Sequence, residues 1–144
     1  MGSLSKLFAG TKRREPEVDS AISVLRGKTV VAVETSPIVL RVLGLAMSEA
    51  GANFLAFSST PELLSGASSS KPHVALLNAG DLGYDTASIV KQIKSEFPGV
   101  RVVLLTDLAR NLEPAAASLL GADAVHRKPF DAGKLLDSIA RLLR

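Results

Sequence analysis

The fold of this chain is decided near its C-terminus, by residues 121–130, which read GADAVHRKPF. Within this stretch a short apolar run, residues 124–126, predicts a buried strand. Asp131 then follows as a helix-capping residue, and residues 132–143 repeat apolar side chains along one helical stripe. The stretch therefore joins the last strand of the chain to its last helix.

Upstream of this junction, apolar runs of strand length alternate with helical patterns. Ser36 and Thr60 each precede a proline and so predict the starts of two helices. The strand-length runs lack alternation of apolar and polar residues, as expected where helices cover both faces of a parallel sheet. The sequence thus predicts an α/β fold of order (βα)5, with helices on both faces of a five-stranded parallel sheet. The predicted strands are residues 29–33, 53–57, 73–77, 100–105 and 124–126.

Charge is distributed unevenly between the N-terminal segment and the rest of the chain. The 144 residues include 17 Lys or Arg and 14 Asp or Glu, a formal net charge of +3. Residues 1–28 hold six of the basic and three of the acidic residues, so the remaining 11 of each sign cancel. The predicted folded part lacks the basic surface that nucleic-acid binding needs, and a nucleic-acid partner is not expected.

The sequence has no cysteine, which excludes disulfides and thiolate metal sites. No run reaches the ~20 uninterrupted apolar residues of a membrane span. The N-terminus also lacks the apolar core of a signal peptide. We therefore expect a cytoplasmic protein with one folded domain and, because the last helix runs to residue 143, no output domain after it.

Residues 1–27 form a separate segment, with a basic cluster at Lys12, Arg13 and Arg14 and a short helical pattern over residues 18–25. Isolated helices shorter than roughly 12–15 residues are marginal in water, so this helix must dock on another surface to persist. The segment is predicted to be a basic tail with a short helix, and its cluster is a candidate contact element.

The types and spacing of four residues at predicted strand ends resemble those of the receiver domain of bacterial response regulators. Thr106 ends the fourth predicted strand, and Lys128 with its following proline lies 22 positions later, as in receivers. Asn78 lies 44 positions after Glu34 and 28 before Thr106, close to the receiver separations between acidic pocket, phosphoacceptor and hydroxyl. The resemblance covers residues 28–144 and implies a receiver, or flavodoxin-like, fold for this domain.

The pocket departs from the receiver pattern in the residues that would carry its chemistry. In receivers two acids and the phosphoacceptor aspartate bind Mg²⁺, which prefers anionic oxygens; the matching residues here are Glu34, Thr35 and Asn78. Two of these three positions lack a carboxylate, so no metal or cofactor is expected. An amide is also too weak a nucleophile to form an acyl phosphate, so phosphorylation at Asn78 is not expected. Asp107 stands where receivers carry a small residue, and its carboxylate would repel a phosphoryl group. Lys128, which pairs with the phosphoryl group in receivers, is left with Glu34 or Asp107 as an ion-pair partner.

The resemblance and these departures together predict a pseudo-receiver, a phosphorylation-independent signalling or scaffold module that binds proteins and is not an enzyme. One alternative is a receiver still switched by phosphate at Asp81 or by a small anion near Lys128. A lower-ranked alternative is a flavodoxin-like domain that holds a ligand at the carboxyl ends of its strands. The loop at residues 34–39 argues against this last class, because it lacks the glycine-rich or hydroxyl-rich cradle that phosphate binding needs.

Two surfaces are candidates for protein binding. On the first predicted helix of the domain, residues 37–50, the spacing of core positions leaves Leu40 and Leu45 on the outer side, around Gly44. The occupant of this face would be residues 22–25 of the same chain or another protein. The second surface is the face of the fourth helix, fifth strand and fifth helix, through which receivers form dimers. Its candidate residues, which would support a homodimer, are Val125, Leu135 and Leu142.

Overall fold

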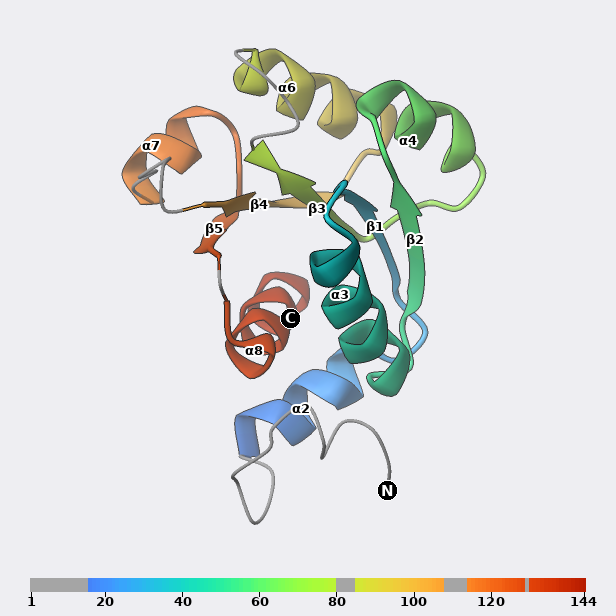
Figure 1. The fold of residues 1–144 in the computed structure, drawn as a ribbon, viewed down its shortest axis with the longest axis vertical. Coiled ribbons are helices and arrows are strands. Elements are labelled where there is room, and N and C mark those ends of the chain that lie inside the picture. Colours follow the sequence, from blue (N-terminus) through green and yellow to red (C-terminus); the bar gives the residue numbers. More distant parts are fainter. Residues whose placement is uncertain (1–15, 80–84, 108–113, 129) are drawn as a thin grey trace.

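The computed structural model describes residues 16–79, 85–107, 114–128 and 130–144 (Figure 1). The strands are β1 (Thr29–Val33), β2 (Asn53–Phe57), β3 (Val74–Asn78), β4 (Arg101–Thr106) and β5 (Ala124–Arg127). The helices are α2 (Pro16–Leu25), α3 (Pro37–Glu49), α4 (Thr60–Gly66), α6 (Thr86–Glu96), α7 (Pro114–Leu119) and α8 (Ala132–Leu143). Within these ranges no helix is long and apolar enough to cross a membrane. Every predicted strand is present, with its ends within one residue of the expected positions.

The five strands form one parallel sheet in the order β2-β1-β3-β4-β5. β1 pairs with β2 on one side, from Thr29 opposite Asn53 onward, and with β3 on the other. Neighbouring parallel strands cannot be joined by tight hairpins, so helices make the crossovers between them. The predicted α/β fold, a five-stranded parallel sheet with helices on both faces, is confirmed.

Helices cover the sheet in two layers, with α3 and α8 on one face and α4, α6 and α7 on the other (Figure 1). Alternate residues of β1 pack against the two helix layers, because successive side chains of a strand point to opposite faces of the sheet. Val30 and Ala32 pack with α3 and α8, whereas Val31 and Val33 pack with α4 and α6. All five residues of β1 are buried, which explains why the sequence shows no alternation there.

Helix α2 lies outside the five β/α units and packs on α8 (Figure 1). Its Ala21 and Leu25 are fully buried and belong to the same cluster as the buried residues of α3 and α8. After the helix, Gly27 has a φ of +78°, a conformation that favours glycine, and its N–H donates to the carbonyl of Gly51 at 2.9 Å. The short N-terminal helix therefore docks, as its length requires, but on α8 rather than on the outer side of α3.

Serine side chains cap the N-termini of two helices, and in one of the two the capping residue lies one position earlier than predicted. Ser36 caps α3, where its Oγ accepts a hydrogen bond from the N–H of Val39 at 3.3 Å. In α4 the cap is Ser59 instead of Thr60, and its Oγ accepts from the N–H of Glu62 at 3.3 Å. The Ser-x-x-Glu spacing of a capping box begins at Ser59, which places Thr60 in the first turn.

Two aspartates at helix N-cap positions give a matched pair for a stability test. Asp131 accepts a hydrogen bond from the N–H of Lys134 at 3.0 Å, whereas Asp85 makes no side-chain capping bond at the start of α6. We expect Asp131→Ala to lower the free energy of unfolding by about 1 kcal/mol and Asp85→Ala to leave it nearly unchanged. Urea denaturation measures both values. Equal losses would show that the capping bond of α8 contributes nothing.

Candidate functional site

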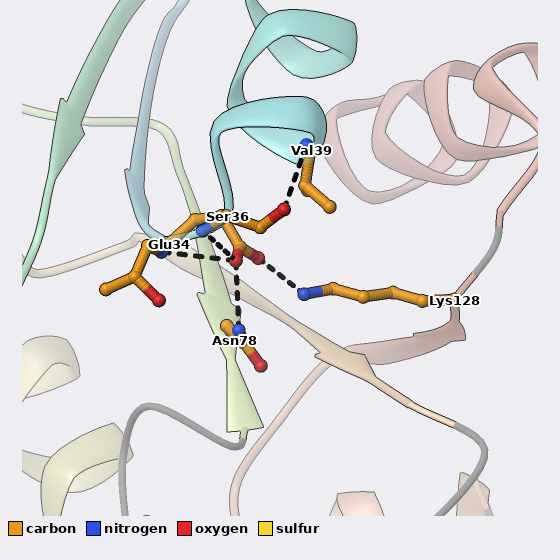
Figure 2. Close-up of polar contacts among 6 residues, drawn as sticks. Glu34, Ser36, Val39, Asn78 and Lys128 are labelled. Atoms are coloured by element: carbon orange, nitrogen blue, oxygen red, sulfur yellow. Dashed lines mark hydrogen bonds and ion pairs between the residues drawn. The ribbon is translucent and has the colours of Figure 1, made fainter.

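The carboxyl ends of the parallel strands bring the receiver-like residues to one edge of the sheet. Glu34 follows β1, Asn78 ends β3, Thr106 ends β4 and Lys128 follows β5. Figure 2 shows the side chains of Asn78 and Lys128 converging on the Glu34 carboxylate from different strands. Three of the predicted pocket residues, Glu34, Asn78 and Lys128, therefore meet through their side chains.

The Glu34 carboxylate is the centre of this pocket, and its side chain has an exposed fraction of 0%. Its Oε1 accepts hydrogen bonds from the backbone N–H groups of Thr35 at 3.2 Å and Ser36 at 3.0 Å. The same oxygen accepts from Asn78 Nδ2 at 3.0 Å, and Oε2 accepts from Lys128 Nζ at 2.7 Å. A carboxylate has about four lone-pair positions, so four donors leave it well satisfied.

Local structure on either side of Glu34 fixes the direction of its side chain. The Glu34 N–H donates to the carbonyl of Phe57 at 3.1 Å, which holds the end of β1 against β2. Ser36 begins α3, so the backbone donors that reach the carboxylate lie at a helix N-terminus, where negative charge is favoured. Backbone donors at the start of α3 and the ammonium group of Lys128 therefore both contact the same carboxylate.

Lys128 reaches the pocket from the last strand. Its backbone N–H donates to the carbonyl of Thr106 at 2.6 Å, and Arg127 pairs with Thr106 in the sheet. The Lys128 side chain is 18% exposed, and the contact with Glu34 is a charge-assisted hydrogen bond within an ion pair. Glu34 is one of the two partners suggested by the sequence; the other, Asp107, is an exposed residue.

The residues of this pocket fit a divalent cation poorly. Mg²⁺ is bound in proteins by carboxylates in near-octahedral geometry, and the matching positions offer one carboxylate, one hydroxyl and one amide. The single carboxylate already holds Lys128. Nor does the described part of the chain contain any group of three or more His, Cys, Asp or Glu side chains that could hold a metal.

Comparison with solved structures identifies the fold. A response regulator from Thermotoga maritima matches with a TM-score of 0.73 and 20% identity, over 81% of this chain and 98% of the other. The chemotaxis response regulator CheY4 of Vibrio cholerae matches with a TM-score of 0.70 and 20% identity, over 81% and 99% of the two chains. A CheY-like protein, TadZ, from Pseudomonas aeruginosa PAO1 matches with a TM-score of 0.63 and 24% identity, over 81% and 99%. This chain has the receiver fold.

The matched part of this chain covers nearly the whole of each of these receiver-fold structures, so it contains the complete five-unit fold. No protein-family profile matches the sequence, and neither does any curated protein. At this level of identity the comparison establishes the fold, and the chemistry of the pocket follows from its own residues.

The candidate residues on α3 are exposed to different degrees in the receiver fold. Leu45 has an exposed fraction of 41%. Leu40 is half-buried and lines a groove of about 370 Å³ with Ala56 and Phe57, beside the pocket. At Gly44 an added Cβ would lie 4.0 Å from the Phe54 ring, which is an ordinary van der Waals distance.

Leu135 of α8 differs from the expectation that it belongs to an exposed surface. Its exposed fraction is 0%, and Leu142 is half-buried against the same core cluster. Leu135 belongs to a buried cluster formed by the sheet, α3, α8 and α2, and α2, which packs on α8, contributes Ala21 and Leu25 to it. Val125 of β5 is half-buried and packs on the opposite face of the sheet.

Three exposed apolar side chains were not singled out by the sequence, and one of them, Leu55 of β2, has an exposed fraction of 38%. Ile38 in the first turn of α3 has an exposed fraction of 77%, and Leu119 at the end of α7 one of 89%. The seven-residue spacing of Ile38 and Leu45 could have indicated a common side of α3. Asp81 and the basic cluster Lys12, Arg13 and Arg14 lie outside the described residues.

Removing the cation of the ion pair tests how strongly the buried carboxylate depends on it. We expect Lys128→Met to lower the free energy of unfolding by about 3–5 kcal/mol, because Glu34 is then buried without a counter-ion. Lys134→Met removes an exposed cation of α8 and is the matched control, with an expected change below about 0.5 kcal/mol. Chemical denaturation followed by circular dichroism measures both variants. A loss for Lys128→Met no larger than that of the control would contradict the assignment.

His126 predicts a specific pH dependence of stability. It is half-buried on β5, and burial lowers the pKa of its imidazole. In the unfolded chain the imidazole binds a proton near its ordinary pKa of about 6.5, while the folded protein keeps it neutral to lower pH. Stability is therefore lost as the pH falls below the unfolded pKa. We expect His126→Gln to flatten this decline between about pH 7 and pH 5, as measured by denaturant titrations across that range; an unchanged pH profile would refute the prediction.

Proposed function

We propose that this chain is a receiver-like signalling or scaffold module of bacterial two-component type that acts by protein binding, without phosphorylation. The observation that carries the proposal is the ion pair between Lys128 and Glu34 at 2.7 Å. In receivers the matching lysine pairs with the phosphoryl group, a partner that comes and goes. Here the counter-ion of Lys128 is part of the chain and is always present.

An incoming phosphoryl group would have to displace this internal partner. Three further donors hold the Glu34 carboxylate in place, namely Asn78 and the backbone N–H groups of Thr35 and Ser36. Loss of Lys128 would leave Glu34 buried with an unpaired charge, which is strongly destabilising. The phosphoryl group would also bring further negative charge close to that carboxylate. Both energetic costs favour a pocket that keeps its ion pair over a pocket that rearranges to bind a phosphoryl group.

Asn78 supports the same conclusion from the chemistry of its side chain. Its amide donates to Glu34 at 3.0 Å and is oriented by that bond. An amide at this position offers no nucleophile for forming an acyl phosphate. The proposed module therefore has neither phosphotransfer nor other catalytic activity at this pocket.

The proposed partner surface is the outer side of α3. Ile38 and Leu45 are exposed by 77% and 41%, and their seven-residue spacing places them on one side of the helix. Residues 29–144 carry equal numbers of basic and acidic residues, which favours a protein partner over nucleic acid. The module would thus present the same apolar surface on α3 at all times, because the neighbouring pocket does not change its ion pair.

Amide NMR spectra test the absence of a phosphate response. We expect no saturable shifts at Asn78, Thr106 and Lys128 when beryllofluoride, a phosphoryl mimic, is added in the presence of Mg²⁺. The control is Glu34→Gln, which removes the internal counter-ion and is expected to produce anion-dependent shifts at Lys128. Saturable shifts at all three residues of the unmodified chain would mean that the pocket still senses phosphate, and the proposal would fail.

A further inference from the structure

A cavity of about 510 Å³ lies at the amino ends of β3 and β4, at the opposite edge of the sheet from the Glu34 pocket. Residues 68–73, the β3 wall, and residues 96–99, the β4 wall, supply most of its lining, and the end of α8 completes it. Small-molecule sites in proteins usually have volumes of roughly 300–1,000 Å³. The lining combines charged and apolar side chains, among them Lys71, His73, Glu96, Phe97, Pro98 and Leu143.

The backbone of the β4 wall is held in a tight turn. The N–H of Val100 donates to the carbonyl of Phe97 at 3.0 Å, across Pro98 and Gly99. Gly99 has a φ of +86°, which the third position of a type II turn requires, and proline is common at the second. Because the ring of Pro98 also fixes its own φ, this wall is rigid before any ligand binds. A preformed wall reduces the entropy that binding costs.

Lys71 of the β3 wall has an unusual backbone conformation for a residue with a side chain. Its φ is +48°, whereas every other described residue with a positive φ is a glycine. Glycine would adopt this conformation without the steric cost that a Cβ brings. Conformations of this kind are concentrated at ligand clamps and other functional positions. Lys71 is exposed and forms no ion pair with any other residue that the structure describes.

His73 offers a hydrogen-bond donor to the same cavity. The N–H of Thr29 donates to His73 Nδ1 at 3.0 Å, and the N–H of His73 donates to the carbonyl of Thr29 at 2.8 Å. A backbone N–H can only donate, so Nδ1 is the unprotonated nitrogen of the ring and Nε2 carries the proton. The imidazole is exposed and lines the cavity, so its Nε2–H group can donate to a ligand there.

The β4 wall contributes charge of the opposite sign. Glu96 is exposed at the end of α6, and within the described ranges its carboxylate pairs neither with Lys71 nor with any other cation. A simple anion would be attracted by Lys71 but repelled by Glu96, and a simple cation would meet the reverse arrangement. A ligand that carries both charges is attracted by both walls.

We propose that this cavity binds a small zwitterion with an apolar side chain, the chemistry shared by apolar amino acids and their dipeptides. The carboxylate of the ligand binds Lys71 Nζ and His73 Nε2, and its ammonium group binds the carboxylate of Glu96. Its side chain lies against the apolar lining that Pro98 and Leu143 provide. This site shares no residue with the Glu34 pocket or with the outer side of α3, so its test can fail without the proposed function failing.

Amide NMR titrations of the whole chain with phenylalanine and with phenylalanyl-leucine test the proposal. We expect at least one of these zwitterions to give saturable shifts at Lys71, His73 and Gly99, while Asn78 and Thr106 at the opposite edge stay unmoved. The tighter ligand of the two shows whether the cavity is suited to an amino acid or to a dipeptide. Absence of saturable shifts with both zwitterions would overturn the proposal.

Two analogues of phenylalanine test whether both charges are needed. 3-Phenylpropanoate lacks the ammonium group, and phenethylamine lacks the carboxylate. Each is expected to bind at least about tenfold more weakly than the zwitterion, because each loses a charge-assisted hydrogen bond. Equal affinity for either analogue would show that the cavity selects apolar surface alone, and the proposed ligand class would be wrong.

Variants of the two walls then assign each charge to its partner. We expect Lys71→Met to weaken binding of the zwitterion about tenfold, to the level of phenethylamine, and Glu96→Gln to weaken it to the level of 3-phenylpropanoate. Lys91→Met is the matched control, because it removes an exposed cation of α6 that does not line the cavity. All three positions are exposed, and the amide spectrum of each variant reports whether it is folded. Folded Lys71→Met and Glu96→Gln variants that bind as tightly as the control would place the ligand elsewhere and overturn the proposal.

Discussion

A carboxylate and an ammonium group buried at one edge of the sheet impose the constraint on which the rest of the pocket depends. Glu34 follows β1 and Lys128 follows β5, so their contact spans the ends of β3 and β4 that lie between them. Neither charge is tolerated in this environment alone. The segments that leave β1, β3 and β5 are therefore held in one relative arrangement by electrostatics as well as by the strand ladder.

Packing on one face of the sheet supports the same arrangement. Helix α3 supplies the N–H of Ser36 to the carboxylate at its start, and it buries Leu43, Ala46 and Met47 against the core further along. Movement of the pocket away from its ion pair would thus disturb a packed helix.

The sequence was most informative where structure is set locally. Uninterrupted apolar runs located all five strands, and the spacing of Glu34, Asn78, Thr106 and Lys128 located the pocket, because parallel strands bring their carboxyl ends to one edge. It was least informative about which helix packs on which surface of the domain. The burial of Leu135 and the docking of α2 on α8 depend on which apolar faces meet in three dimensions, and helical periodicity alone does not contain that choice.

The shared donors of Glu34 also bear on how this pocket can change over many generations. An aspartate at position 78 would replace the amide donor, 3.0 Å from the carboxylate, with a second negative charge, and one lysine cannot balance two adjacent buried carboxylates. A change at position 34 or 128 alone would leave the opposite charge unpaired. Each single step toward a metal-binding pocket thus passes through a less stable protein. Substitutions at positions 34, 78 and 128 are therefore coupled through the stability of the fold.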